Sequence, residues 1–190
     1  MQENITVHTY MDAVTFKNFA SFDAFRMKKR WVSPAIYTGI LLAASVVCFC
    51  LNMSGSLFMG SVLLILGLGL PAVWYGTFLS QLGAQIKQLK LDKARPVYTL
   101  RMGPEEIRIH NDMKAEQEQV LTWKQVAGVW RGKGAFYLYV TAAKAFILPD
   151  RMYDCTPMEL HAYFTEHLGA EKVHAKVVPE DQTQERITKS

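Results

Sequence analysis

"VSPAIYTGILLAASVVCFCLNM" occupies residues 32–53, and "LFMGSVLLILGLGLPAVWYGTFL" follows at residues 57–79 after a short polar turn. From Trp31 to Ile86 there is no Asp, Glu, Lys, Arg or His, a run of 56 residues. Each stretch exceeds the roughly 20 residues that an α-helix needs to cross a bilayer, whereas a pair of soluble helices would need a polar face. The sequence therefore predicts a transmembrane helical hairpin, with spans at 31–53 and 57–80 and an external turn at 54–56.

The charges beside this hairpin predict its orientation. Residues 1–30 carry five Lys or Arg and three acidic residues, and residues 87–95 carry four and one. Residues 96–190 are nearly neutral, so the net charge of +4 is juxtamembrane. By the positive-inside rule, both termini face the cytoplasm. We expect a multi-pass protein of the bacterial inner membrane, and no nucleic-acid partner, because the basic charge belongs to the anchor.

The pattern changes after a basic juxtamembrane linker at residues 81–95. Short alternating runs joined by turns of hairpin length predict an antiparallel sheet of about six strands in a module at residues 96–169. "TPME" (residues 156–159) is a capping box with Pro at the first helical position, which predicts a closing helix that stops at Gly169. This sheet with one C-terminal helix is the outline of a pleckstrin-homology-like (PH-like) domain. Residues 170–190 have no aromatic side chain and predict a disordered tail.

Four quoted motifs in this module carry a family resemblance. They are "YTLRMGPEEIRIH" (98–110), "TWKQV" (122–126), "FYLYV" (136–140) and "AFILPDR" (145–151). Together with the charge-free hairpin, they resemble the YcxB-like family of bacterial membrane proteins, over nearly the whole chain to about residue 169. The resemblance implies a membrane α+β fold: a transmembrane helical hairpin plus a small antiparallel PH-like sheet capped by a C-terminal helix. It implies no catalytic residue.

The cytoplasmic N-terminal segment, residues 1–30, combines a strand pattern with a phenylalanine ladder. Ile5 to Tyr10 alternates, and phenylalanines then occupy positions 16, 19, 22 and 25. Steps of three sweep the four rings across about 180° of a helix, and Arg26 falls within that arc. We expect strand and Phe helix to dock on the C-terminal sheet, which makes the hairpin an insertion within one unit. Rigid attachment is the expected role of the arc, and curvature or lipid sensing is the alternative.

The sequence predicts no catalytic, cofactor-binding or metal site. No nucleophile motif or phosphate loop occurs, and His161 and His167 are six residues apart, on different helix faces. One candidate patch for an anionic ligand remains near the hairpin ends of the sheet, and ordinary surface is the alternative. It consists of Arg131, Lys133, Lys144 and Arg151.

The predicted function is therefore non-enzymatic. The chain is expected to be a membrane-anchored cytoplasmic binding or scaffold module, in contact with the lipid bilayer and with an unidentified protein partner. The alternative is a sensor of anionic lipid headgroups that uses the basic patch. Gly39 and Ala43 form a small-xxx-small pair that would permit homo-oligomers through the transmembrane helices.

Overall fold

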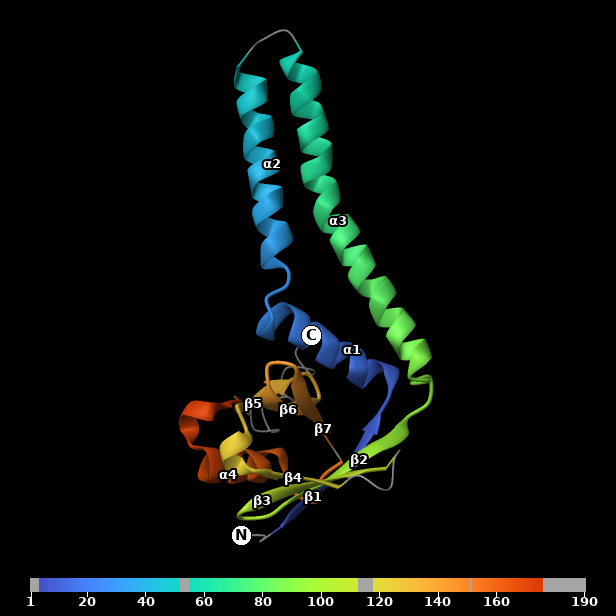
Figure 1. Ribbon diagram of the computed structural model, residues 1–190, viewed down its shortest axis with the longest axis vertical. Helices are drawn as coiled ribbons and strands as arrows, with labels where there is room; N and C mark the ends of the chain where they lie inside the picture. The colour runs from blue at the N-terminus through green and yellow to red at the C-terminus, as the bar shows by residue number, and fades with distance from the viewer. Residues whose placement is uncertain (1–3, 52–54, 113–117, 151, 176–190) are drawn as a thin grey trace, which may run out of the picture. The chain divides into compact units, whose positions relative to one another are not determined.

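The first strand of the chain pairs with a strand that lies beyond both apolar helices in sequence. The computed structural model describes residues 4–51, 55–112, 118–150 and 152–175. It divides into a sheet unit, residues 1–19 with 91–190, and a helical unit, residues 20–90. The two units together mix helices with mainly antiparallel sheets (Figure 1). Each unit is described separately below.

The first sheet of the sheet unit has the order β1-β2-β3-β4, and every pairing is antiparallel. Its strands are β1 (Ile5–Met11), β2 (Arg95–Met102), β3 (Glu106–Asn111) and β4 (Glu118–Thr122). In β1 and β2 the register places Ile5 opposite Met102 and Val7 opposite Leu100. All four side chains are buried, because alternate residues of a strand point to the same face. The N-terminal strand that the sequence predicts is thus an edge strand of this sheet.

The second sheet has the order β7-β6-β5-β8. Its strands are β5 (Gly128–Gly132), β6 (Ala135–Thr141), β7 (Lys144–Pro149) and β8 (Val173–His174). The pairing of β5 with β8 is parallel, and the other two pairings are antiparallel. The six antiparallel strands predicted for residues 96–169 are therefore confirmed as β2 to β7, but the prediction that they form a single sheet was wrong. Alternation predicts that a strand exists, but not which strand it pairs with.

A 3₁₀ turn at Trp123–Gln125 carries the chain from one sheet to the other. The side chains of Thr122 and Gln125 close this turn as a reciprocal capping box. Trp123 is buried, and its Nε1–H donates to the carbonyl oxygen of Gly103 at 2.9 Å. The turn therefore anchors the crossover to the β2–β3 connection and separates β4 from β5.

The core of the sheet unit lies between the inner faces of the two sheets and α4 (Pro157–Leu168). Thr156 accepts a hydrogen bond from the Glu159 backbone, and the Glu159 carboxylate accepts one from the Thr156 backbone, so the predicted capping box is confirmed. The face of α4 that packs on the sheets consists of Leu160, Tyr163, Phe164 and Leu168.

The prediction of a disordered tail from residue 170 was wrong for its first residues. A 3₁₀ turn at Ala170–Lys172 leads into β8, where Val173 pairs with Val129. The His174 ring lies 4.9 Å from the Trp130 ring, centroid to centroid. A strand of two residues forms here because the edge of β5 offers backbone hydrogen bonds and the Trp130 ring contacts His174. Residues 176–190 lie outside the described residues.

Helix α1 (Ala13–Phe22) begins in the sheet unit and covers the outer face of β6 there. The Phe19 ring meets the Tyr137 ring edge-on at 5.2 Å and lies 6.4 Å from that of Tyr139. Phe136 and Leu138 fill the inner core in alternation with these tyrosines. A strand that is buried on both faces reads as a continuous apolar run, which explains "AFYLYV". The division between the two units falls after Phe19, inside α1.

The helical unit contains α2 (Val32–Cys50) and α3 (Ser56–Gln88), which run side by side (Figure 1). Both are long and apolar enough to cross a membrane. Ser45 Oγ donates to the Gly60 carbonyl oxygen at 2.7 Å, and a Cβ at Gly67 would lie 3.2–3.3 Å from Leu41 and Leu42. Serine and glycine thus let the two backbones approach closely in this half of the pair.

The linker predicted at residues 81–95 is mostly helix. Helix α3 continues through "QLGAQIKQ" and ends at Gln88, so only residues 89–94 connect it to β2. Residues 81–88 contain no proline, and their glutamine, alanine and lysine residues favour helix. The amino-acid composition predicts the end of the apolar span near residue 80. The helix ends later, at Gln88, because its backbone hydrogen bonds do not require apolar side chains.

Candidate functional site

The three described cations of the predicted basic patch are not all brought together. Arg131 and Lys133 lie at the β5–β6 turn, whereas Lys144 begins β7 at the opposite end of β6. The seven residues of β6 span about 20 Å. Arg151 lies outside the described residues. The predicted patch is therefore wrong as a single site, because the turns that carry its cations are at opposite ends of one hairpin.

Arg131 already has an anionic partner. Its Nη1 and Nη2 donate to the two carboxylate oxygens of Asp150 at 2.5 and 2.7 Å, and its Cζ lies 4.5 Å from the centroid of the Phe136 ring. Tyr153 Oη donates to the same carboxylate at 2.9 Å. Burial, and then the neighbouring charge of Asp150, raise the pKa of Tyr153, which therefore stays a neutral donor. This bidentate pair ties the end of β7 to β5 and leaves little positive charge for a ligand.

Lys144 also has a structural partner. Its Nζ donates to Gln119 Oε1 at 2.6 Å and lies 5.4 Å from the centroid of the Phe146 ring. This contact joins the start of β7 to β4, in the other sheet. Lys144 is thus a link between sheets.

His161, His167 and Cys155 have structural positions in the sheet unit. The His167 ring is tilted against those of Tyr163 at 4.2 Å and Trp123 at 4.8 Å, and His161 hydrogen-bonds the Ala175 carbonyl oxygen at 2.9 Å. Burial raises the pKa of the Cys155 thiol to about 11, so the thiol is protonated at neutral pH and is a poor nucleophile. Among the residues that the structure describes, no group of three or more His, Cys, Asp or Glu could hold a metal ion.

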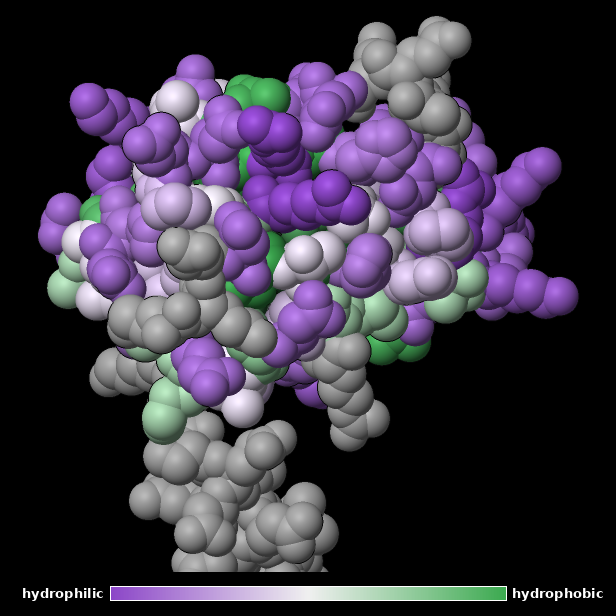
Figure 2. All heavy atoms as spheres, turned by 90° about the horizontal axis from the view of Figure 1, so that it is seen from below, coloured by the Kyte–Doolittle hydropathy of each residue, from purple (hydrophilic) through white to green (hydrophobic). Residues whose placement is uncertain are grey.

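A polar groove of about 460 Å³ lies at the end of β2 and β3. Its charged lining mixes signs: Arg101 and Arg108 face Glu105 and Glu106, and Arg108 donates to Glu106 at 2.6 Å. Figure 2 shows one face of the molecule, on which hydrophilic residues cover most of the surface and apolar residues appear as small separate areas. The mixed charges of the groove do not select a ligand of one charge.

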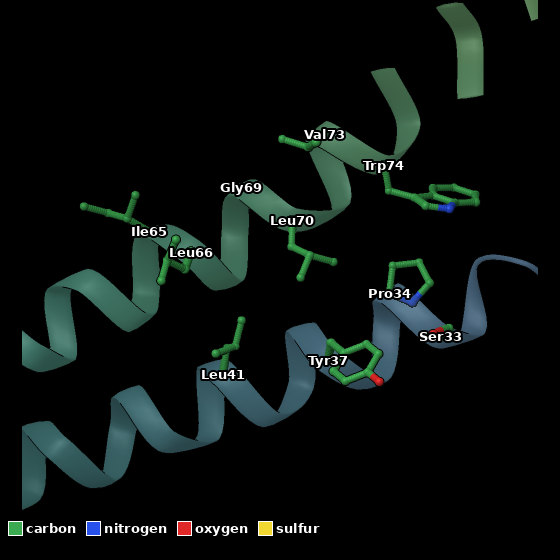
Figure 3. Close-up of a pocket in the computed structure, with 10 residues that line it drawn as sticks. All are labelled: Ser33, Pro34, Tyr37, Leu41, Ile65, Leu66, Gly69, Leu70, Val73 and Trp74. Atoms are coloured by element: carbon green, nitrogen blue, oxygen red, sulfur yellow. The ribbon is translucent and has the colours of Figure 1, made fainter. Parts of the chain in front are cut away.

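An apolar groove lies between α2 and α3 in the helical unit. It has a volume of about 800 Å³, and its lining runs from Ser33 to Leu41 on α2 and from Ile65 to Trp74 on α3 (Figure 3). Pro34, Tyr37 and Leu41 line it from α2. Leu66, Leu70 and Trp74 line it from α3. Sequence reasoning missed this groove, because only the divergence of the two helices creates it.

The end of this groove carries a polar and cationic segment. Ser33 lines the groove in the first turn of α2, and the exposed residues Lys29 and Arg30 directly precede that helix. The groove is therefore apolar along its length and basic beside one end.

No protein family, curated protein or solved structure matches this chain. The YcxB-like resemblance thus stays a prediction, and the function is argued from the residues.

Proposed function

We propose that this protein is a membrane-anchored, non-enzymatic binding module, whose sheet unit presents a surface to a protein partner in the cytoplasm. One observation carries the proposal. Strands β1 and β2 are neighbours in one sheet, yet two helices of span length, uncharged from Val32 to Ile86, are inserted between them in the chain. A domain held this way is attached to its anchor by two chain connections, which restricts its orientation at the membrane.

Exposed apolar surface supports the membrane part of the proposal. Large hydrophobic side chains are exposed along both helices of the helical unit, for example Leu57 at 71% and Phe58 at 76%. Elsewhere in the described residues, the exposed large hydrophobic residues are only Tyr10, Val14, Trp31, Leu51, Leu89, Val120 and Met158, of which Trp31 and Leu51 flank α2. A continuous apolar surface of this extent is unfavourable in water and suits lipid.

The expected topology follows from the flanking charges. Basic residues precede α2 and follow the apolar part of α3, so both ends of the hairpin belong on the cytoplasmic side of a bacterial inner membrane. Two four-stranded sheets with a C-terminal helix are compatible with the PH-like fold and with the YcxB-like resemblance. In that fold, the hairpin would take the place of the β1–β2 connection.

A protein partner is favoured over headgroup recognition by the sheet unit. Arg131 is paired with Asp150, and Lys144 lies at the other end of β6, so the cations of the predicted patch that the structure describes do not form one concentrated positive site. Recognition of anionic lipid by such a domain needs several cations on one surface. A mixed-charge, mostly hydrophilic surface suits a polar, reversible protein interface.

Cysteine labelling in intact bacterial cells tests the anchor. In a full chain with Cys48, Cys50 and Cys155 replaced by alanine, Ser56→Cys should react with a membrane-impermeant maleimide from outside. Lys133→Cys should react only after the cells are permeabilised. Equal labelling of both positions in intact cells, or release of the protein from membranes by alkaline carbonate, would contradict the proposal. Site-specific photocrosslinking from Lys133 and Arg101 in the same cells would then test for a protein partner.

A further inference from the structure

We propose that the groove between α2 and α3 binds one phospholipid with an anionic headgroup. One of its two acyl chains would lie between Tyr37 and Leu70, and its phosphate beside Lys29 and Arg30. The inference rests on the proposed membrane anchoring of the helical unit. The site is separate from the basic patch predicted in the sheet unit.

The size of the groove fits a lipid chain. Its volume of about 800 Å³ lies within the roughly 300–1,000 Å³ of ligand pockets. Figure 3 shows Leu41 and Tyr37 on α2, with Leu66, Leu70 and Trp74 on α3, around an open space between the helices. Beyond Leu41 the helices are close at Gly60, where an added Cβ would crowd the ring of Phe49. The groove therefore ends within the hairpin.

The length of the groove fits one leaflet. Its lining on α2 runs from Ser33 to Leu41, a rise of about 12 Å. Half of a hydrocarbon core about 30 Å thick is about 15 Å. A transmembrane helix from another chain would run along the whole thickness, whereas an acyl chain of the cytoplasmic leaflet would occupy this part alone. This comparison favours lipid over a second copy of the chain as the occupant.

The charge beside the groove selects the headgroup. Lys28 is paired with Asp23 at 2.6 Å, and the exposed Lys29 and Arg30 follow it directly. Two bonds hold this segment at the start of α2: Arg30 N–H donates to the Ala24 carbonyl oxygen at 2.8 Å, and Trp31 Nε1–H to that of Phe25 at 3.2 Å. Cations beside an apolar groove complement a phosphate joined to an acyl chain, and basic pockets between membrane helices bind such lipids.

Phe25 links this basic segment to the groove wall. Its ring meets the ring of Trp74, a lining residue, edge-on at 5.6 Å, and that of Phe78 at the same distance. Trp74 and Phe78 are stacked at 6.1 Å. Phe25, the last phenylalanine of the ladder, thus has a specific role. It holds the segment that contains Lys29 and Arg30 against α3, which lines the site.

Native mass spectrometry of the full-length protein, released from detergent, tests the proposal with two added probes. These are dioleoylphosphatidylglycerol, which is anionic, and dioleoylphosphatidylcholine, which is zwitterionic. Gly69 lines the groove, and an added Cβ there meets no atom within 4 Å, so Gly69→Leu should fill the groove without a clash. Gly76 is equally open but is not a lining residue, which makes Gly76→Leu the matched control. Lys29→Gln with Arg30→Gln tests the headgroup contact, against Lys87→Gln with Lys93→Gln.

The wild type and Gly76→Leu should each bind one phosphatidylglycerol and prefer it to phosphatidylcholine. In Gly69→Leu the apparent affinity should fall about tenfold. The Lys29/Arg30 variant should lose the preference, whereas its control should keep it. The proposal is overturned if Gly69→Leu binds like Gly76→Leu, if the wild type does not discriminate between the lipids, or if Gly69→Leu instead dissociates a dimer. Alkaline carbonate extraction of membranes tests the anchor separately. If all variants stay in the membrane, a loss of lipid binding is not caused by loss of the anchor.

Discussion

Tyr98 and Ile147 exchange two hydrogen bonds between the two sheets of the sheet unit. The Ile147 N–H donates to Tyr98 Oη at 2.6 Å, and Tyr98 Oη donates to the Ile147 carbonyl oxygen at 3.1 Å. Thr9 Oγ1 donates to the same carbonyl oxygen at 3.0 Å. One side chain from β2 and one from β1 thus satisfy the backbone of β7, where a strand partner would otherwise be required.

Tyr98→Phe should destabilise the sheet unit. The substitution leaves the Ile147 N–H without its hydrogen-bond acceptor, which costs about 1–3 kcal/mol of unfolding free energy. Thermal unfolding of the full chain in detergent, followed by near-ultraviolet circular dichroism, measures the loss. Tyr10→Phe is the control, because Tyr10 is 43% exposed. If the two variants unfold at the same temperature, the bridge between the sheets contributes nothing.

Phe19→Ala should weaken the packing of α1 on β6. Phe19 is half-buried against Tyr137, so the expected cost is about 2 kcal/mol, roughly half that of a fully buried phenylalanine. Val14→Ala in the same helix, at a side chain that is 64% exposed, should change little. Proteolysis of the full chain in detergent would show the difference as faster cleavage of the sheet unit in Phe19→Ala. Equal cleavage rates would show that α1 does not stabilise the sheet.

The stability of the sheet unit should fall as the pH rises above 9, in part because of Cys155. Burial raises the pKa of this thiol from 9.0 to about 11. Between these values the unfolded chain loses the proton and the folded chain keeps it, so the unfolded state gains stability with rising pH. Below pH 9 both states are protonated and the effect is absent.

Cys155→Ala should remove this part of the pH dependence. Urea midpoints measured from pH 8 to 10 should decline less steeply in Cys155→Ala than in the wild type. That range limits the contribution of tyrosines, because a tyrosine in the unfolded chain begins to lose its proton only near its ordinary pKa of 10.0. Parallel slopes for the two proteins would show that the thiol is as exposed in the folded state as in the unfolded one.

The sequence could predict elements whose cause is local. The charge-free spans, the alternation in β1, β2 and β3, and the box at Thr156 each depend on neighbouring residues only. Partners depend on residues far away in the chain, so the division into two sheets, the parallel β5–β8 pair and the separation of Lys144 from Arg131 could not be read from periodicity. The groove between α2 and α3 is of the same kind, because it exists only where two helices diverge.

The most direct test of these long-range contacts concerns β8, which the sequence predicts to be tail. A chain that ends at Gly169 should be less stable than one that ends at Ala175. Removing residues 170–175 removes the pairing of Val173 with Val129. It also removes the contact between the His174 and Trp130 rings at 4.9 Å and the hydrogen bond between His161 and the Ala175 carbonyl oxygen at 2.9 Å. The expected difference is about 1–3 kcal/mol, from one hydrophobic side chain and a few hydrogen bonds.

Urea unfolding in detergent, followed by tryptophan emission, compares the two shortened chains. In the chain that ends at Gly169, Trp130 should become more exposed, and its emission should shift to longer wavelength before global unfolding begins. Trp130→Phe in both chains identifies the source of the shift, because the difference in the spectra should disappear while the difference in midpoints persists. Identical midpoints would mean that β8 covers the edge of β5 without stabilising it.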